Sequence, residues 1–106
     1  MNNALLALLA IPFLLPTVAA SPPAVEIKND AYLPATLTIT AGQTVTFNNE
    51  DDDAHTVTAT NGSFDSKGLD SGALWRHKFE KPGTYRYFCE LHSFMKGSII
   101  VKAVML

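Results

Sequence analysis

Short segments in which apolar and polar residues alternate, separated by turn residues, fill the chain from Val25 onward. Residues 36–40 alternate threonine with leucine and isoleucine, an Ala-Gly turn follows, and Val45 and Phe47 continue the apolar face. Side chains two residues apart lie on the same face of a strand, so these threonines should face water and the apolar residues a core. A succession of such strands is typical of a β-sandwich or a β-barrel.

The same pattern continues toward the C-terminus. Residues 84–89 follow a Lys-Pro-Gly turn, residues 97–102 form a closing strand, and Asn-Gly and Lys-Gly pairs at 61–62 and 67–68 mark further turns. No segment after residue 20 keeps a 3.6-residue apolar period between turn signals, so no helix of ordinary length is expected. We therefore predict an all-β fold in a single domain.

The first twenty residues contain no charged side chain. An apolar run covers Ala4 to Ile11, and Val18-Ala19-Ala20 supplies the small residues that precede a signal-peptidase cleavage site. The start lacks the usual Lys or Arg, and an uncleaved membrane anchor is the alternative, but two prolines interrupt an apolar run near the lower limit for a membrane span. We interpret residues 1–20 as a signal peptide and residues 21–106 as the domain. The protein is then exported to the periplasm, or to the outer surface of a host that has none.

The charge balance limits the partners of this domain. The formal net charge is −2, and no basic stripe with interleaved aromatic residues occurs, which argues against nucleic-acid binding. No polybasic segment indicates membrane binding. We expect a monomer that binds neither nucleic acid nor, after signal cleavage, a membrane.

Cys89 is the only cysteine in the chain. Small exported domains commonly gain stability from disulfide bonds, which one cysteine cannot form within a chain. An unpaired thiol in an oxidising compartment is open to oxidation unless another group occupies its sulfur.

Residues of metal-ligand type follow this cysteine at regular spacing. His92 and Met95 lie three and six residues after Cys89, and a tight loop with this spacing turns a sulfur, an imidazole and a thioether toward one point. His55 supplies the fourth donor, because it and Cys89 both lie at strand ends on inward faces. Two His, one Cys and a long axial Met form the blue-copper electron-transfer site, where soft sulfur favours Cu(I). We predict one copper ion per chain, held by His55, Cys89, His92 and, more weakly, Met95.

This ligand set predicts a one-electron carrier, not an enzyme. Such a carrier must change oxidation state with little rearrangement, so its ligands should suit both states and be held by the fold. His92, in the loop, is the expected exit for the electron, and Leu91, Ser93 and Phe94 should surround its ring edge with a mostly apolar surface suited to brief docking. The expected partners are redox proteins of the cytochrome or dehydrogenase type.

Three other functions would use the same residues. A copper carrier or copper-resistance protein needs the same ligands, but the extra Met or His clusters expected of it do not occur. Cys89 as a nucleophile with His92 as its base would need an oxyanion-binding loop and a substrate cleft, for which the sequence offers little room. Zinc also suits thiolate and imidazole, although a Met ligand would be unusual for it.

The sequence resembles the cupredoxins, and most closely the group of plastocyanin, pseudoazurin and amicyanin. The resemblance extends from Val25 to Val101, and its motifs are Phe47-Asn48-Asn49-Glu50-Asp51, His55-Thr56-Val57, Phe64-Asp65-Ser66, Pro82-Gly83-Thr84-Tyr85 and the run from Cys89 to Gly97. The compact Cys-x-x-His-x-x-Met loop is most similar to that of amicyanin. The resemblance implies a Greek-key β-sandwich of two sheets with the copper site at one end. By position, His55 matches the first ligand, Cys89 the thiolate, His92 the exposed imidazole and Met95 the axial ligand.

Two features depart from the family pattern. Many members have Asn directly after the first His, where it helps to tie the two ligand loops together, whereas this chain has Thr56. The second His of amicyanin is flanked by prolines, whereas His92 lies between Leu91 and Ser93. Because those prolines are missing, we expect a less constrained ligand loop.

The remaining His, a late Met and an acidic run receive no ligand role. His77 shares a face with Trp75 and Phe79 and should pack at a sheet margin. Met105 lies among the last residues, where fraying is typical. We interpret the run 50–53 as a solvated loop near the copper end. If this run instead faces the docking surface, its negative charges should attract a basic partner.

Overall fold

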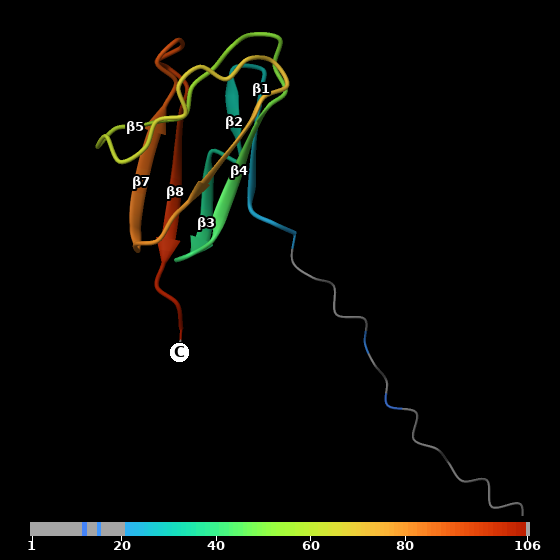
Figure 1. The fold of residues 1–106 in the computed structure, drawn as a ribbon, viewed down its shortest axis with the longest axis vertical. Coiled ribbons are helices and arrows are strands. Elements are labelled where there is room, and N and C mark those ends of the chain that lie inside the picture. The colour runs from blue at the N-terminus through green and yellow to red at the C-terminus, as the bar shows by residue number, and fades with distance from the viewer. Residues whose placement is uncertain (1–11, 13–14, 16–20, 106) are drawn as a thin grey trace, which may run out of the picture.

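The computed structural model describes residues 12, 15 and 21–105, and eight strands within them form two sheets (Figure 1). One sheet has the order β2 (Ala31–Leu33), β1 (Ala24–Lys28), β4 (Thr44–Asn49) and β6 (Leu74–Lys78). The other has the order β3 (Thr36–Thr40), β8 (Lys96–Lys102), β7 (Gly83–Phe88) and β5 (Thr58–Ala59). The described residues contain no helix, and the two sheets confirm the predicted all-β sandwich.

Both sheets mix parallel and antiparallel pairs. β1 runs parallel to β4 and β3 parallel to β8, while the other neighbouring pairs are antiparallel. β1 and β2 are joined by the two-residue turn Asn29-Asp30, in which φ is 52° and 55°. Asn and Asp tolerate this left-handed conformation better than other side chains, and a two-residue turn of this kind matches the twist of a hairpin.

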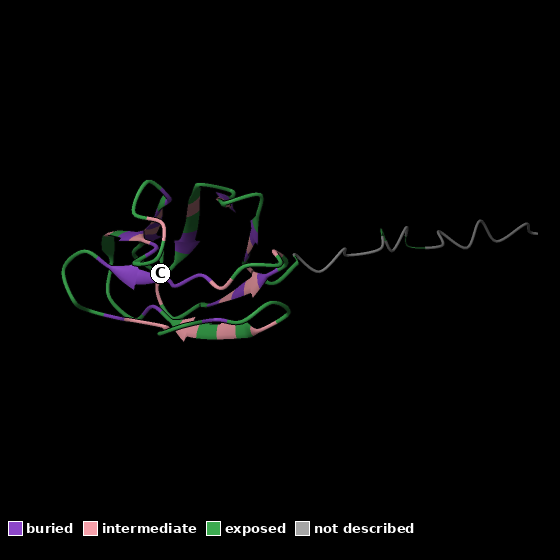
Figure 2. Ribbon diagram, turned by 90° about the horizontal axis from the view of Figure 1, so that it is seen from above, coloured by how far each residue is buried: buried purple, intermediate pink, exposed green. Residues whose placement is uncertain are grey.

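The core lies between the two sheets. The expected alternation holds in β3, where Thr36, Thr38 and Thr40 are exposed and Ile39 is buried. The edge strand β6 alternates exposed and half-buried residues along its length (Figure 2). Each large apolar side chain that is fully buried stabilises the fold by about 1.5–3 kcal/mol. The buried apolar residues of the strands are Val25, Ile27, Tyr32, Ile39, Val45, Phe47, Ala59, Tyr87, Ile99 and Val101.

The segment around His55, which was expected to lie at the end of a strand, contains little regular strand. β5 covers only Thr58–Ala59, and His55 lies in a single bridge to Leu69, whose N–H donates to the His55 carbonyl at 2.7 Å. Alternation also fails in this segment, because the threonines at 56 and 58 are buried together with their apolar neighbours. Their hydroxyl groups form a hydrogen bond with each other at 2.9 Å in the interior.

The loops that follow β4 and β7 lie at the same end of the sandwich, at the top of Figure 1, and the C-terminus lies at the other end. This arrangement brings the segments around His55 and Cys89 together. The predicted signal peptide, residues 1–20, lies outside the described residues except for Pro12 and Leu15, and stays a prediction. Within the described part of the chain, no helix has the length and apolar character needed to cross a membrane.

Candidate metal centre

Three of the four predicted donors meet at the loop end of the sandwich. Cys89 Sγ lies 3.7 Å from His55 Nδ1 and 3.9 Å from His92 Nδ1. The two imidazole rings have their centroids 4.9 Å apart. An ion bound by nitrogen at about 2.0 Å and by sulfur at about 2.3 Å, with about 120° between the bonds, holds these donors about 3.7 Å apart. The spacing of the donors therefore fits a single metal ion between them.

Different elements position the three side chains. Cys89 comes directly after β7, on the inward face that it shares with Tyr87, and both are fully buried. His55 is also fully buried and is held by its bridge to Leu69. His92 belongs to the loop between β7 and β8 and is only partly buried, so it is the donor that lies nearest to solvent.

Met95 closes the loop that contains Cys89 and His92. Its N–H donates to the His92 carbonyl at 2.9 Å, and its carbonyl accepts from the Cys89 N–H at 3.2 Å. The side chain is 2 % exposed, and it belongs to the apolar core. The backbone of Met95 is thus tied to both neighbouring donors, while its role as an axial ligand stays a prediction.

The surroundings of Cys89 favour a thiolate. Burial by itself raises the pKa of this thiol. This effect is outweighed by hydrogen bonds from the Thr56 N–H, the side chain of His92 and the N–H groups of Leu91 and His92. The pKa of Cys89 is therefore held below its ordinary value. The Thr56 N–H points at Sγ from 3.3 Å. Since the thiolate is the form that binds metals, this environment prepares the sulfur as a ligand.

Thr56 also ties the two ligand loops together. Its Oγ1 accepts the Glu90 N–H at 2.9 Å, across 34 residues of sequence. Many members of the family have Asn at this position, where it helps to tie the two ligand loops together. In this chain the threonine hydroxyl makes a hydrogen bond between the same two loops.

Asp51 is the residue near the centre that sequence reasoning missed. Its Oδ2 lies 2.8 Å from His55 Nε2, and its Oδ1 and Oδ2 accept the N–H groups of Asn29 and Asp30 at 2.6 and 2.9 Å. The Asp30 N–H, followed by those of Asn29 and the His55 ring, lowers the pKa of Asp51. The interpretation of this part of the acidic run as a solvated loop is therefore wrong. The four-residue spacing between Asp51 and His55 was the only signal in the sequence.

His77 and Met105 lie outside this centre. The His77 ring stacks on Trp75, with centroids 5.3 Å apart and 15° between the planes, and contacts Phe64 and Phe79. Burial lowers the pKa of His77. Its position on the edge strand β6 confirms the expected packing at a sheet margin. Met105 is 95 % exposed.

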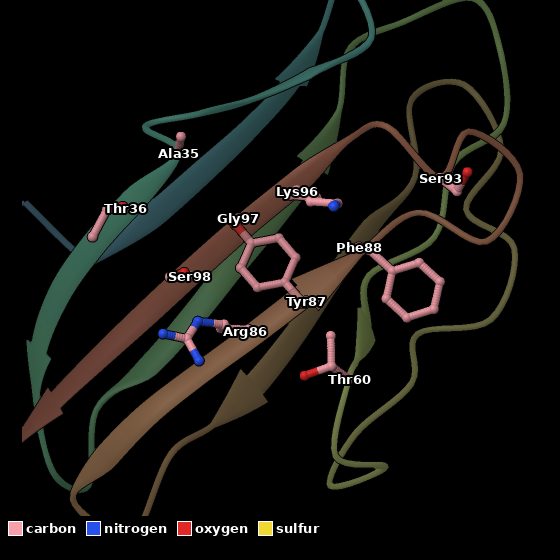
Figure 3. Close-up of a pocket in the computed structure, with 10 residues that line it drawn as sticks. All are labelled: Ala35, Thr36, Thr60, Arg86, Tyr87, Phe88, Ser93, Lys96, Gly97 and Ser98. Carbon is pink, nitrogen blue, oxygen red and sulfur yellow. The ribbon is translucent and has the colours of Figure 1, made fainter.

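A hollow of about 580 Å³ lies away from the three donors. It opens on β7 and β8, where Arg86, Phe88 and Lys96 line it, and Figure 3 shows that Ser93 is its contact with the ligand loop. None of the three donors lines it. Two of the three donors, His55 and Cys89, are fully buried side chains.

Comparisons with known proteins agree with this architecture. Residues 4–101 match the family model of the cupredoxin-like domain. The chain is 33 % identical to amicyanin of Paracoccus versutus over 96 residues, which cover 82 % of this chain and 73 % of that protein. A reduced amicyanin variant of known structure superimposes with a TM-score of 0.73 at 27 % identity, over 81 % of this chain and 87 % of the other.

A larger protein shares the same domain. The Cu-containing nitrite reductase from Thermus scotoductus SA-01 superimposes with a TM-score of 0.74 at 30 % identity, over 83 % of this chain. This chain spans only 24 % of that reductase, so the match concerns one of its domains and not its activity. The family match, the two sheets and the His, Cys and His donors lead to one conclusion: the chain belongs to the cupredoxin family.

Proposed function

We propose that the protein is an exported carrier of single electrons, in which His55, Cys89 and His92 bind one copper ion and Met95 completes the site as a weak axial ligand. Membership of the cupredoxin family indicates a copper-binding electron carrier. The observation that carries the ligand assignment is the convergence of the two Nδ1 atoms on Cys89 Sγ at 3.7 and 3.9 Å. Copper supplies the one-electron chemistry, since thiolate and imidazole together suit both of its oxidation states.

The chain holds these donors in place before the metal arrives. Cys89 follows a paired strand, His55 is fixed by backbone bonds to Leu69, and the Thr56 hydroxyl joins the two loops. Donors held in this way need little rearrangement when the charge of the ion changes. The low-exposure environment of His55 and Cys89 also keeps water out of the site.

We assign the exit of the electron to His92 and the docking surface to the residues around it. Leu91 and Phe94 are 58 % and 68 % exposed, and the Phe94 ring lies 6.0 Å from the His92 ring between centroids. Exposed apolar side chains next to a partly buried ligand form a small surface that suits a weak and transient complex. The partners are redox proteins, of the cytochrome or dehydrogenase type.

Export is supported by the sequence at the N-terminus. The uncharged apolar stretch and the Val18-Ala19-Ala20 cleavage pattern are features of a secretory signal. The eight strands of the described residues lie between residues 24 and 102, so removal of residues 1–20 keeps all of them. A periplasmic or outer-surface location is also consistent with a single cysteine whose sulfur is occupied by a metal.

The test is to add Cu(II) to residues 21–106 and to record visible absorption and electron-paramagnetic spectra. We expect an intense thiolate-to-copper band and a narrow hyperfine splitting, both abolished by Cys89→Ser. The variant His77→Ala should retain both, because that ring lies outside the centre. A colourless protein, or an ordinary Cu(II) spectrum, contradicts the proposal.

A further inference from the structure

The His55 ring is bound on both of its nitrogen atoms. Nδ1 faces Cys89 Sγ at 3.7 Å, and Nε2 faces Asp51 Oδ2 at 2.8 Å. The histidine is fully buried, whereas the Asp51 side chain retains 15 % exposure. One ring nitrogen thus faces the metal centre and the other faces a carboxylate.

Asp51 is itself held in a fixed position. Oδ1 accepts the Asn29 N–H at 2.6 Å, Oδ2 accepts the Asp30 N–H at 2.9 Å, and the Asp51 N–H donates to Asn49 Oδ1 at 3.0 Å. Asn49 is fully buried, and its amide nitrogen donates to the carbonyl of Leu69, which also accepts the His55 N–H. The carboxylate and the imidazole are therefore parts of one hydrogen-bond network.

The chemistry of a carboxylate decides which ring nitrogen carries the proton. An ionised carboxylate only accepts hydrogen bonds, so Nε2 must donate its hydrogen to Asp51, and the lone pair of Nδ1 is left free toward Cys89. A histidine whose second nitrogen donates to a carboxylate is also a more basic metal ligand. Such a ligand favours the more highly charged Cu(II) over Cu(I).

We propose that Asp51 is a positioning residue for copper: it fixes His55 with the proton on Nε2 and lowers the reduction potential by strengthening Cu(II) binding more than Cu(I) binding. This inference rests on the proposed function for its effect on potential. The effect of Asp51 on the position of the proton in the His55 ring exists in the metal-free protein as well.

The competing explanation for a lowered reduction potential is that any negative charge near His55 has this effect, without a hydrogen bond to the ring. Asp30 Oδ1 lies 3.5 Å from the same His55 Nε2, and Asp52 belongs to the same acidic run. Asp52 is exposed, and it makes no side-chain hydrogen bond or ion pair with the part of the chain that the structure describes. Asp52→Asn therefore removes one charge from the loop and leaves the network intact, which makes it the matched control.

The first test compares Asp51→Asn with Asp52→Asn in the copper-loaded protein. The amide that Asp51→Asn introduces presents its NH₂ group either to the Asn29 N–H or to the donors at Oδ2, so one side of the network is broken. We expect Cu(II) binding to weaken about 10–100-fold, with a smaller change for Cu(I). Each tenfold loss of Cu(II) affinity relative to Cu(I) affinity raises the reduction potential by about 59 mV. Equal potentials in the two variants would overturn the proposal.

The second test uses the metal-free native protein, and so remains decisive if Asp51→Asn does not fold. Long-range ¹⁵N–¹H correlation spectra, at a pH where the ring is neutral, distinguish a protonated ring nitrogen from one with a free lone pair. We expect the proton of His55 on Nε2, and a proton on Nδ1 would overturn the inference. If the native protein forms no blue site with copper, the proposed function fails, whereas this spectrum still decides the role of Asp51.

Discussion

At the scale of single residues, the proposed copper site contains two buried sulfur-bearing side chains with different surroundings. Cys89 receives hydrogen bonds that stabilise its charged form, while Met95 packs in the apolar core and is tied through its backbone. A thiolate is a strong ligand for copper, and a thioether on a long bond is a weak one that tunes the potential. Replacing each sulfur should therefore have a different result.

Met95→Leu should keep the blue colour and raise the reduction potential. The substitution conserves volume in the core but removes a donor whose loss disfavours Cu(II) more than Cu(I). A tenfold loss of relative Cu(II) affinity corresponds to about 59 mV, which a spectroscopic redox titration resolves. Met105→Leu is the control, because that side chain is 95 % exposed. An unchanged or lowered potential in Met95→Leu would show that Met95 is not the axial ligand.

At the scale of elements, two contacts hold the ligand loop on the sandwich. One is the bond from the Glu90 N–H to the Thr56 hydroxyl, which links the loop to the segment of His55. The other is the pairing of β7 with β8, the strands on either side of the loop, where Tyr87 faces Gly97. Each contact leads to a stability prediction that does not require copper.

Thr56→Val should destabilise the metal-free protein by about 1–3 kcal/mol, because it leaves the Glu90 N–H without its acceptor and removes the bond to Thr58. Denaturant-induced unfolding followed by circular dichroism measures the change. Thr38→Val, on the exposed face of β3, should stay within about 0.5 kcal/mol of the native protein. Equal effects of the two substitutions would mean that the tie between the loops contributes nothing to stability.

Gly97→Ala should also destabilise the fold, by about 1–3 kcal/mol, through overpacking. A Cβ atom at this position would clash with Cζ and the hydroxyl oxygen of Tyr87, and that ring is confined by Tyr32, 4.7 Å away between centroids. Thermal unfolding should show a lower midpoint. Gly68→Ala meets no atom within 4 Å and serves as the control. A native-like midpoint for Gly97→Ala would show that the Tyr87 ring moves freely out of the way.

At the scale of the whole molecule, charge and apolar surface gather at the metal end. Carboxylate oxygens of Asp30 and Asp53 lie within 4.8 Å of a His92 ring nitrogen and of each other. Leu91 and Phe94, both exposed, belong to the same loop as His92. An apolar contact area with a negative rim suits a partner with a positive rim.

Electron transfer to a cationic c-type cytochrome should therefore slow as salt is added, because exposed charges are screened beyond about 8 Å at physiological ionic strength. Stopped-flow kinetics over a range of ionic strengths measure this dependence. Asp53→Asn should flatten it, whereas Glu80→Gln, in the turn before β7 at the other end of that strand, should not. Association rates that do not change with salt would contradict a negative docking rim.

The strands and the ligand loop were predictable because they depend on residues close together in the chain. The alternation in 36–40, the turn at Gly42 with φ of 94°, and the spacing of Cys89, His92 and Met95 are local features. Alternation failed at residues 55–59, where a bridge to Leu69 replaces a regular strand. There, side-chain hydrogen bonds within the interior compensate for burying polar groups, and no local pattern encodes them.

The sequence by itself determined the class of the fold, the kind of ligands and the family, since each follows from residue type and spacing along the chain. Only the tertiary structure decided how the centre is supported. The Thr56 hydroxyl reaches Glu90 across 34 residues, and Asp51 receives the Asn29 N–H across 22 residues while its carboxylate faces His55. These contacts depend on how two loops and a hairpin turn pack at one end of the sandwich, and that geometry exists only once the sheets have formed.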